Sequence, residues 1–123
     1  MPQWEIQFRS ETKILEVRVT GQVVKESDRD SMTSEATQEG SKHSCSRFLV
    51  DLSKANAIYS LVDLYNRVET AFPRLGIQRA AKIAVIPPAG FVEKKFFETV
   101  AINRGYAIKV FDLSVALQIA YAD

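Results

Sequence analysis

The residue of this chain whose type and position best suit chemistry is Ser60. It precedes a segment in which apolar residues recur every three or four positions, so its hydroxyl can cap a helix by accepting hydrogen bonds from backbone N–H groups. A phosphate on Ser60 would lie against the same free N–H groups, although the nearby carboxylate of Asp63 would oppose it. Ser60 is therefore a candidate phosphoacceptor or contact residue, and the alternative is a simple helix cap.

Two further residues that could do chemistry are His43 and Cys45, which stand two positions apart in a polar stretch. A structural zinc site needs four ligands, a catalytic one usually takes three from protein, and a Cys–His nucleophile pair needs a geometry that near neighbours on a loop rarely give. The sequence also has no Gly-rich phosphate loop, nucleophile elbow or paired-carboxylate signature. We therefore expect no metal, no cofactor and no catalytic residue, and hence a protein that is not an enzyme.

Two aspartates, Asp51 and Asp112, stand at the C-terminal ends of expected strands. In α/β sheets this edge is where ligands bind, which makes both carboxylates candidate site residues. The alternative roles are helix capping and hydrogen bonding within a loop.

The elements that would position these residues begin with a hairpin. Apolar and polar residues alternate over residues 4–9 and 15–20, and the polar turn Ser10–Lys13 separates the two runs, with Gly21 expected to end the second strand. Residues 48–52 form a short apolar run typical of a strand buried on both faces. The segment Ser53–Tyr59 has no helical period and is predicted to be the connection that leads to Ser60.

Two helices are predicted on either side of that buried strand. The first lies near the centre of residues 25–47, is capped at Ser27 or Asp28, buries a thin face of Met32 and Ala36, and ends near Gly40. The second starts at Ser60 and ends or kinks near Phe72, because Pro73 lacks an N–H, and Gly76 closes the turn after it.

The remaining third of the chain continues the alternation. Residues 81–86 are predicted to form a buried strand, a helix follows from Gly90 to Arg104, and Gly105 supplies the left-handed residue past its end. Residues 106–111 are the last predicted strand, and Asp112 or Ser114 caps a terminal helix. Alternating strands and helices predict an α/β single domain over residues 1–123. Its mixed, mostly parallel sheet should have about five strands, an N-terminal β-hairpin and about four helices.

Composition narrows the partners and the compartment. The 123 residues carry 16 Lys and Arg against 15 Asp and Glu, so no net field draws the protein to nucleic acid. A single cysteine excludes an internal disulfide, and the N-terminus has neither a basic n-region nor an apolar h-region. No apolar run reaches the roughly 20 residues of a transmembrane helix. We therefore expect a cytoplasmic protein without a membrane-spanning segment.

The order of elements resembles that of STAS domains, the superfamily of bacterial anti-anti-sigma factors. Asp51-Leu52-Ser53 resembles the first half of their motif, and Ser60 falls at their phosphoacceptor position, preceded by Tyr59 where the motif has an acid. The chain is more closely similar to the SpoIIAA-like branch, often grouped with the CRAL-TRIO lipid-binding fold. That similarity extends over most of the chain, including Val110-Phe111-Asp112-Leu113.

This resemblance implies a binding or regulatory module that acts through contacts with a protein partner. Its contact face would comprise Asp51, Ser53, Tyr59 and Ser60, together with the rest of the segment Ser53–Tyr59. The CRAL-TRIO likeness and the ring-rich helix with Phe91, Phe96 and Phe97 favour an alternative, a carrier or sensor of a small apolar or amphipathic ligand held between that helix and the sheet. A third hypothesis is a self-associating protein that forms homo-oligomers.

Overall fold

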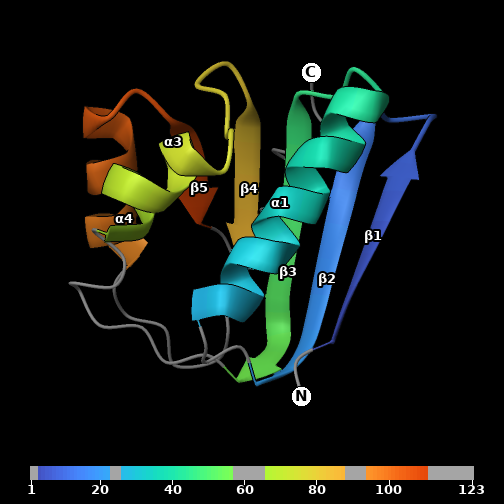
Figure 1. Cartoon of the computed structure of the whole chain (residues 1–123), viewed down its shortest axis with the longest axis horizontal. Coiled ribbons are helices and arrows are strands. Elements are labelled where there is room, and N and C mark those ends of the chain that lie inside the picture. The colour runs from blue at the N-terminus through green and yellow to red at the C-terminus, as the bar shows by residue number, and fades with distance from the viewer. Residues whose placement is uncertain (1–2, 23–25, 57–65, 88–93, 111–123) are drawn as a thin grey trace.

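The structure, a computed structural model, describes residues 3–22, 26–56, 66–87 and 94–110 (Figure 1). Its centre is a five-stranded sheet whose spatial order follows the chain. The strands are β1 (Gln3–Arg9), β2 (Ile14–Gln22), β3 (Arg47–Asn56), β4 (Lys82–Ile86) and β5 (Ala107–Val110). β1 pairs with β2 antiparallel and every other pair is parallel, which confirms the predicted α/β class and the hairpin with its turn at residues 10–13.

The helices within the described residues are α1 (Glu26–Lys42), a π-helical turn η1 (Arg67–Ala71) that passes into α3 (Phe72–Arg74), and α4 (Lys94–Asn103). Figure 1 shows α1 crossing the sheet over β2 and β3, with α3 and α4 beside β4 and β5. The N-terminal part of the helix predicted from Ser60 and the terminal helix predicted from Asp112 or Ser114 lie outside the described residues. The π turn ends two residues before Pro73, whose ring clashes with the carbonyl four residues back in a regular α-helix.

Register places two apolar rows across the sheet face that the helices cover. One row runs from Ile6 through Val17, Val50 and Val85 to Val110, and the next runs from Phe8 through Leu15, Phe48 and Ile83 to Ile108. Successive side chains of a strand point to opposite faces, so the intervening residues of each strand face the other way. That second face carries the buried cluster of Ile14, Leu49, Ala84 and Ile86.

The described C-terminal ends of α1, α3 and α4 share one geometry. After α3, Ile77 N–H donates to the Phe72 carbonyl (3.0 Å) and Gly76 N–H to the Pro73 carbonyl (3.2 Å), with Gly76 at φ 83°. This pair of hydrogen bonds is the Schellman motif, and it recurs at Gly105 (φ 85°) after α4, as the sequence predicts for both glycines.

α1 ends two residues beyond Gly40, close to the end that the sequence predicts. The helix continues to Lys42, and the left-handed residue of its Schellman motif is Ser44, at φ 51°. Gly40 instead allows α1 to pack closely against Phe48, because a Cβ at this position would lie 2.7 Å from Cζ of that ring. Met32 and Ala36 pack partly buried against the core, which confirms the thin apolar face expected for this helix.

The predicted connection Ser53–Tyr59 is wrong in its first half. β3 continues to Asn56 and pairs with β2 past a shift of register. Arg18 pairs with Asp51 and Thr20 with Lys54, so one intervening residue of β2 lies opposite two of β3. Such a mismatch is a β-bulge, which leaves an extra residue unpaired and bends the strand. β3 has a partner over this stretch because β2 also runs further than predicted, through Gly21 to Gln22.

Candidate functional site

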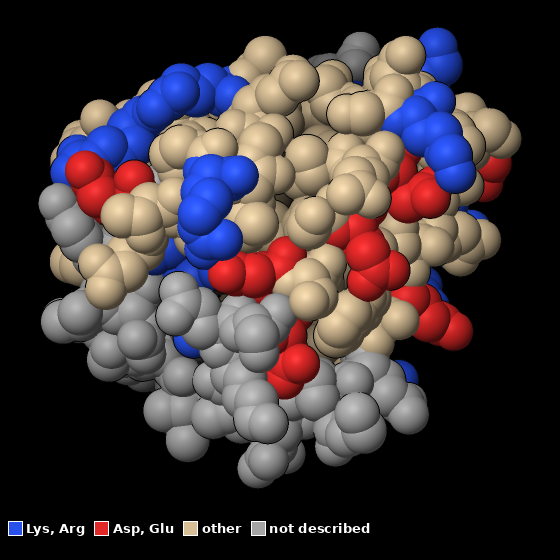
Figure 2. All heavy atoms as spheres, viewed as in Figure 1, with Lys and Arg blue, Asp and Glu red and all other residues tan. Residues whose placement is uncertain are grey.

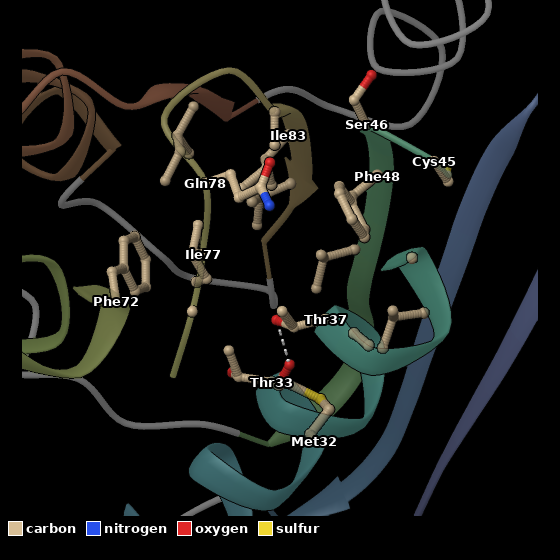
Figure 3. A pocket seen from close by; sticks show the side chains of 18 of the residues that line it. Met32, Thr33, Thr37, Cys45, Ser46, Phe48, Phe72, Ile77, Gln78 and Ile83 are labelled. Carbon is tan, nitrogen blue, oxygen red and sulfur yellow. Dashed lines mark hydrogen bonds between the residues drawn. The ribbon is translucent and has the colours of Figure 1, made fainter. Parts of the chain in front are cut away.

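An apolar cleft of about 490 Å³ lies above the sheet (Figure 3). Its floor is formed by the two rows described above, chiefly through Phe48, Val50, Ile83 and Val85. Clefts of about 300–1,000 Å³ with mostly apolar walls are the usual sites for small ligands. The geometry therefore makes this cleft a candidate binding site.

The two walls of the cleft come from segments distant in sequence. One wall is the face of α1 that carries Met32, Thr33, Ala36, Thr37 and Gly40, and the opposite wall is Phe72 at the start of α3 with the segment that follows it, including Ile77 and Gln78. From the described part of α4, Phe97 alone reaches the lining. Gly40 matters here because it lets α1 approach the Phe48 ring closely and so brings that wall down onto the floor.

One end of the cleft carries uncharged polar groups. Ser41, Ser44, Ser46 and Gln78 line it and are exposed, and we call these four residues the polar mouth. Gln78 and Ser46 are among the side chains drawn around the cleft in Figure 3. Hydroxyl and amide groups both donate and accept hydrogen bonds, so the mouth can satisfy either kind of polar ligand atom.

A charged cluster joins the two walls at the other end. Asp30 of α1 accepts hydrogen bonds from Arg67 of η1 and, at 2.8 Å, from Arg74 of α3. Arg67 is buried, lines the cleft and also donates to the hydroxyl of Thr33 at 3.1 Å. Figure 2 shows acidic and basic groups meeting beside the uncharged surface of this face. The cluster therefore holds η1 and α3 at a set position relative to α1.

Electrostatics favour the ionised form of Asp30. Burial raises the pKa of its carboxyl, but the hydrogen bonds from Arg74 and Arg67 and their positive charges outweigh burial, so the pKa lies below its ordinary value. Asp30 is therefore charged at neutral pH, and its charge compensates that of the buried Arg67.

The sequence-predicted contact residues fall elsewhere. Asp51 and Ser53 lie together at the bulge of β3, where one carboxylate oxygen of Asp51 accepts from the Ser53 N–H at 2.9 Å and from the Ser53 hydroxyl at 2.6 Å. Asp51 belongs to the register row of Arg18 and Ile86, so it faces away from the cleft. Tyr59, Ser60 and Asp112 lie outside the described residues, and their predicted roles stay predictions.

His43 and Cys45 do not face each other. The His43 ring stacks on Phe8 with centroids 4.3 Å apart and lies 3.6 Å from a Glu39 carboxylate oxygen. The sulfur of Cys45 is 3.3 Å from the Lys13 carbonyl oxygen and 3.1 Å from that of Arg47. Across the described ranges, no three side chains of His, Cys, Asp or Glu are grouped so that they could hold a metal ion.

The phenylalanine rings expected to hold an apolar ligand do not share one environment. Phe97 packs edge-on against Phe72, with centroids 6.5 Å apart, whereas Phe96 is 36% exposed and Phe91 lies outside the described residues. The cleft is thus formed mainly between α1 and the α3 wall, and not between the Phe-rich helix and the sheet as predicted. The missed residues are Gly40 and the small polar side chains of α1, and the only sequence signal for them is a helix with an unusually thin apolar face.

The strand order, the antiparallel strand at one edge and the described helices over one face are those of a SpoIIAA-like fold. An uncharacterised protein of the DUF3478 family from Shewanella loihica PV-4, described as having a SpoIIAA-like fold, superposes with a TM-score of 0.58 at 16% identity, covering 97% of this chain and 93% of its own. The anti-sigma factor antagonist SpoIIAA, in its unphosphorylated form, superposes with a TM-score of 0.51 at 10% identity, covering 98% of this chain and 100% of its own.

At these identities the likeness shows the fold alone. No protein-family model matches the chain, and no curated protein matches it in sequence. Among the described residues, no helix is both long and apolar enough to cross a bilayer.

Proposed function

We propose that this protein is a non-enzymatic, cytoplasmic regulatory module that acts through contacts with a protein partner. The observation that carries the proposal is the SpoIIAA-like fold over nearly the whole chain, because one of its structural neighbours is an anti-sigma factor antagonist. The same neighbour, described in its unphosphorylated form, supports phosphorylation of Ser60 as the means of control.

The proposed contact surface is the C-terminal end of β3 and the chain that follows it. Ser53 and Lys54 are exposed there, and the bond between Asp51 and Ser53 holds the bulge in one conformation. A surface that is ordered before binding loses less conformational entropy when a partner docks. Tyr59 and Ser60 follow within a few residues and would extend the same surface.

The test is affinity capture with the whole chain, comparing Lys54→Glu with Lys95→Glu. Both lysines are exposed, but Lys95 lies on α4, so its reversal controls for a general effect of charge. We expect a partner that is retained by wild type and Lys95→Glu and lost with Lys54→Glu. A partner set that all three proteins share would contradict this surface. The intact mass of protein from its own organism, mapped by fragmentation, would show whether Ser60 carries phosphate.

A second function, the carrier or sensor of a small apolar or amphipathic ligand, is favoured by the cleft. Its volume of about 490 Å³ and its floor of aliphatic and aromatic side chains suit such a ligand. Burial of apolar ligand surface in the cleft would supply the affinity. Self-association is the third proposal, and sedimentation over a range of concentrations tests it.

A further inference from the structure

We propose that the cleft selects amphipathic molecules with an uncharged head group, placing an apolar chain on the sheet and an amide or hydroxyl head at the polar mouth. This inference rests on the second proposed function, that of a ligand carrier, and adds the chemical class of the ligand. It is carried by three features of the described lining residues: an apolar floor, polar groups with free hydrogen-bonding capacity, and a single charge that is compensated.

The side chains of the cleft floor are apolar along the direction in which the alkyl chain of a ligand would lie. Phe48 pairs with Ile83, Val50 pairs with Val85, and Ile108 and Val110 continue the two rows across β5. All six of these residues line the cleft. An extended alkyl chain laid along these rows would exchange water for methyl, methylene and ring contacts.

The polar mouth has hydrogen-bonding groups to offer. Within the described residues, the side chains of Gln78, Ser41, Ser44 and Ser46 have no hydrogen-bond partner in the protein. Gln78 presents two amide N–H donors and a carbonyl acceptor, which match a primary amide head group. Thr37, deeper in the cleft, donates its hydroxyl hydrogen to the Thr33 carbonyl at 2.8 Å and keeps an acceptor lone pair.

Charge at the lining is balanced before any ligand enters. Of the described lining residues, Arg67 alone is charged, and the carboxylate of Asp30 compensates it. Near the mouth, Nζ of Lys42 lies 3.5 Å from a Glu39 carboxylate oxygen, and Arg79 donates to the Arg104 carbonyl at 2.8 Å. An ionised head at the mouth would give up part of its hydration shell without meeting an opposite charge among the described lining residues, and that loss is costly.

The experiment is calorimetric titration of the whole protein with decanamide, decanoate and decylammonium, which share one alkyl chain and differ in charge. Each is used below the concentration at which it aggregates, at neutral pH. We expect decanamide to bind at least about tenfold more tightly than either ion. Equal affinity for decanoate and decanamide would overturn the neutral-head inference while leaving the carrier function in place. Failure of all three to bind would overturn both and leave the protein-contact function untouched.

Location in the cleft is tested by variants and by a native thiol. Thr37→Phe fills the cleft and should abolish binding, whereas Thr37→Val keeps its volume and should retain decanamide. Gln78→Leu should weaken the binding of decanamide about threefold to tenfold and leave the binding of the ions unaffected.

Cys45, the sole cysteine, lines the cleft, so bound decanamide should slow its reaction with a thiol reagent in the unmodified protein. An unchanged thiol rate at saturating decanamide would contradict the location.

Discussion

The carboxylate of Asp51 stabilises the bulge of β3. It accepts hydrogen bonds from both the backbone N–H and the hydroxyl of Ser53, and so satisfies polar groups where the ladder between β2 and β3 changes register. This arrangement fits the loop hydrogen bonding considered for Asp51 from the sequence. It leaves open a contact role for Ser53 and Lys54, whose side chains are exposed beside it.

Replacing Asp51 should loosen the bulge in a graded way. Asp51→Ala removes the acceptor and should lower the free energy of unfolding by about 1–2 kcal/mol, whereas Asp51→Asn keeps an oxygen acceptor and should cost less. Urea denaturation measures both variants, and backbone NMR contacts between Thr20 and Lys54 report whether the register persists. An Asn variant as destabilised as the Ala variant would contradict the hydrogen-bonding role.

A second prediction at the residue scale concerns Gly40. Gly40→Ala should gain about 1 kcal/mol of helix propensity, but its Cβ would meet the Phe48 ring at 2.7 Å and force that ring to move, at a cost of about 1–3 kcal/mol. The net result should be a loss of stability in wild type and a gain in a Phe48→Leu background, where the ring is absent. Thermal or urea unfolding of the double-mutant cycle checks this, with Ser41→Ala as the control for propensity alone. If the effects of Gly40→Ala and Phe48→Leu on the free energy of unfolding were additive, they would contradict a contact between these two residues.

Between elements, the contacts of Asp30 decide how α1 and α3 are spaced. The side chain of Arg67 is 10% exposed and that of Asp30 is 22% exposed, so their ion pair is only weakly screened by water. Arg74 adds a more exposed contact to the second oxygen of the same carboxylate. Because these residues come from α1, η1 and α3, the cluster joins the two walls of the cleft.

Asp30→Asn should destabilise the protein by about 1–3 kcal/mol at neutral pH, since it leaves Arg67 buried without its counter-charge. The pKa of Asp30 is lowered in the folded state, so its stabilising effect is complete above the ordinary value of about 3.9 and is lost as pH falls through the folded-state value. Urea unfolding of both proteins from neutral pH to strongly acidic pH should show the difference between them shrinking on acidification. Asp28→Asn, on the same helix, is the control, and a difference that grows in acid would contradict the assignment.

At the scale of the whole molecule, the open edges of the sheet bear on self-association. β5 lies at the edge of the sheet among the described strands, and the N–H of Val110 donates to a Glu98 carboxylate oxygen of α4 at 2.6 Å. A side chain that occupies an edge N–H withholds it from another chain, and it also places a charge at that edge.

Glu98→Ala should therefore increase self-association, because it frees the N–H of Val110 and removes the charge. Sedimentation velocity over a range of concentrations should show a larger assembled fraction than in wild type. Glu98→Gln keeps an oxygen acceptor and should fall between the two. An assembled fraction that Glu98→Ala leaves unchanged would show that this edge takes no part in self-association.

Patterns within single elements carried most of the prediction of the fold. Alternation in residues 4–9 and 15–20, the apolar runs before Asp51 and before Pro87, and the glycines at 76 and 105 are all local properties of the chain. They led to the α/β class, the hairpin and two helix ends, because periodicity and left-handed backbone are set by neighbouring residues. The Asp51-Leu52-Ser53 motif was likewise readable, although its bulge was not.

The sequence by itself therefore determined the class of fold, the order of most elements along the chain and the balanced charge. Only the tertiary structure decided that Ser53–Asn56 extends a strand, since that depends on β2 reaching far enough to pair with it. It also decided that Gly40 lies under Phe48 and that Asp30 meets Arg67, contacts between residues far apart in the chain or on different elements. The cleft follows from these contacts, because a cavity is the space left between packed elements and has no pattern of its own in the sequence.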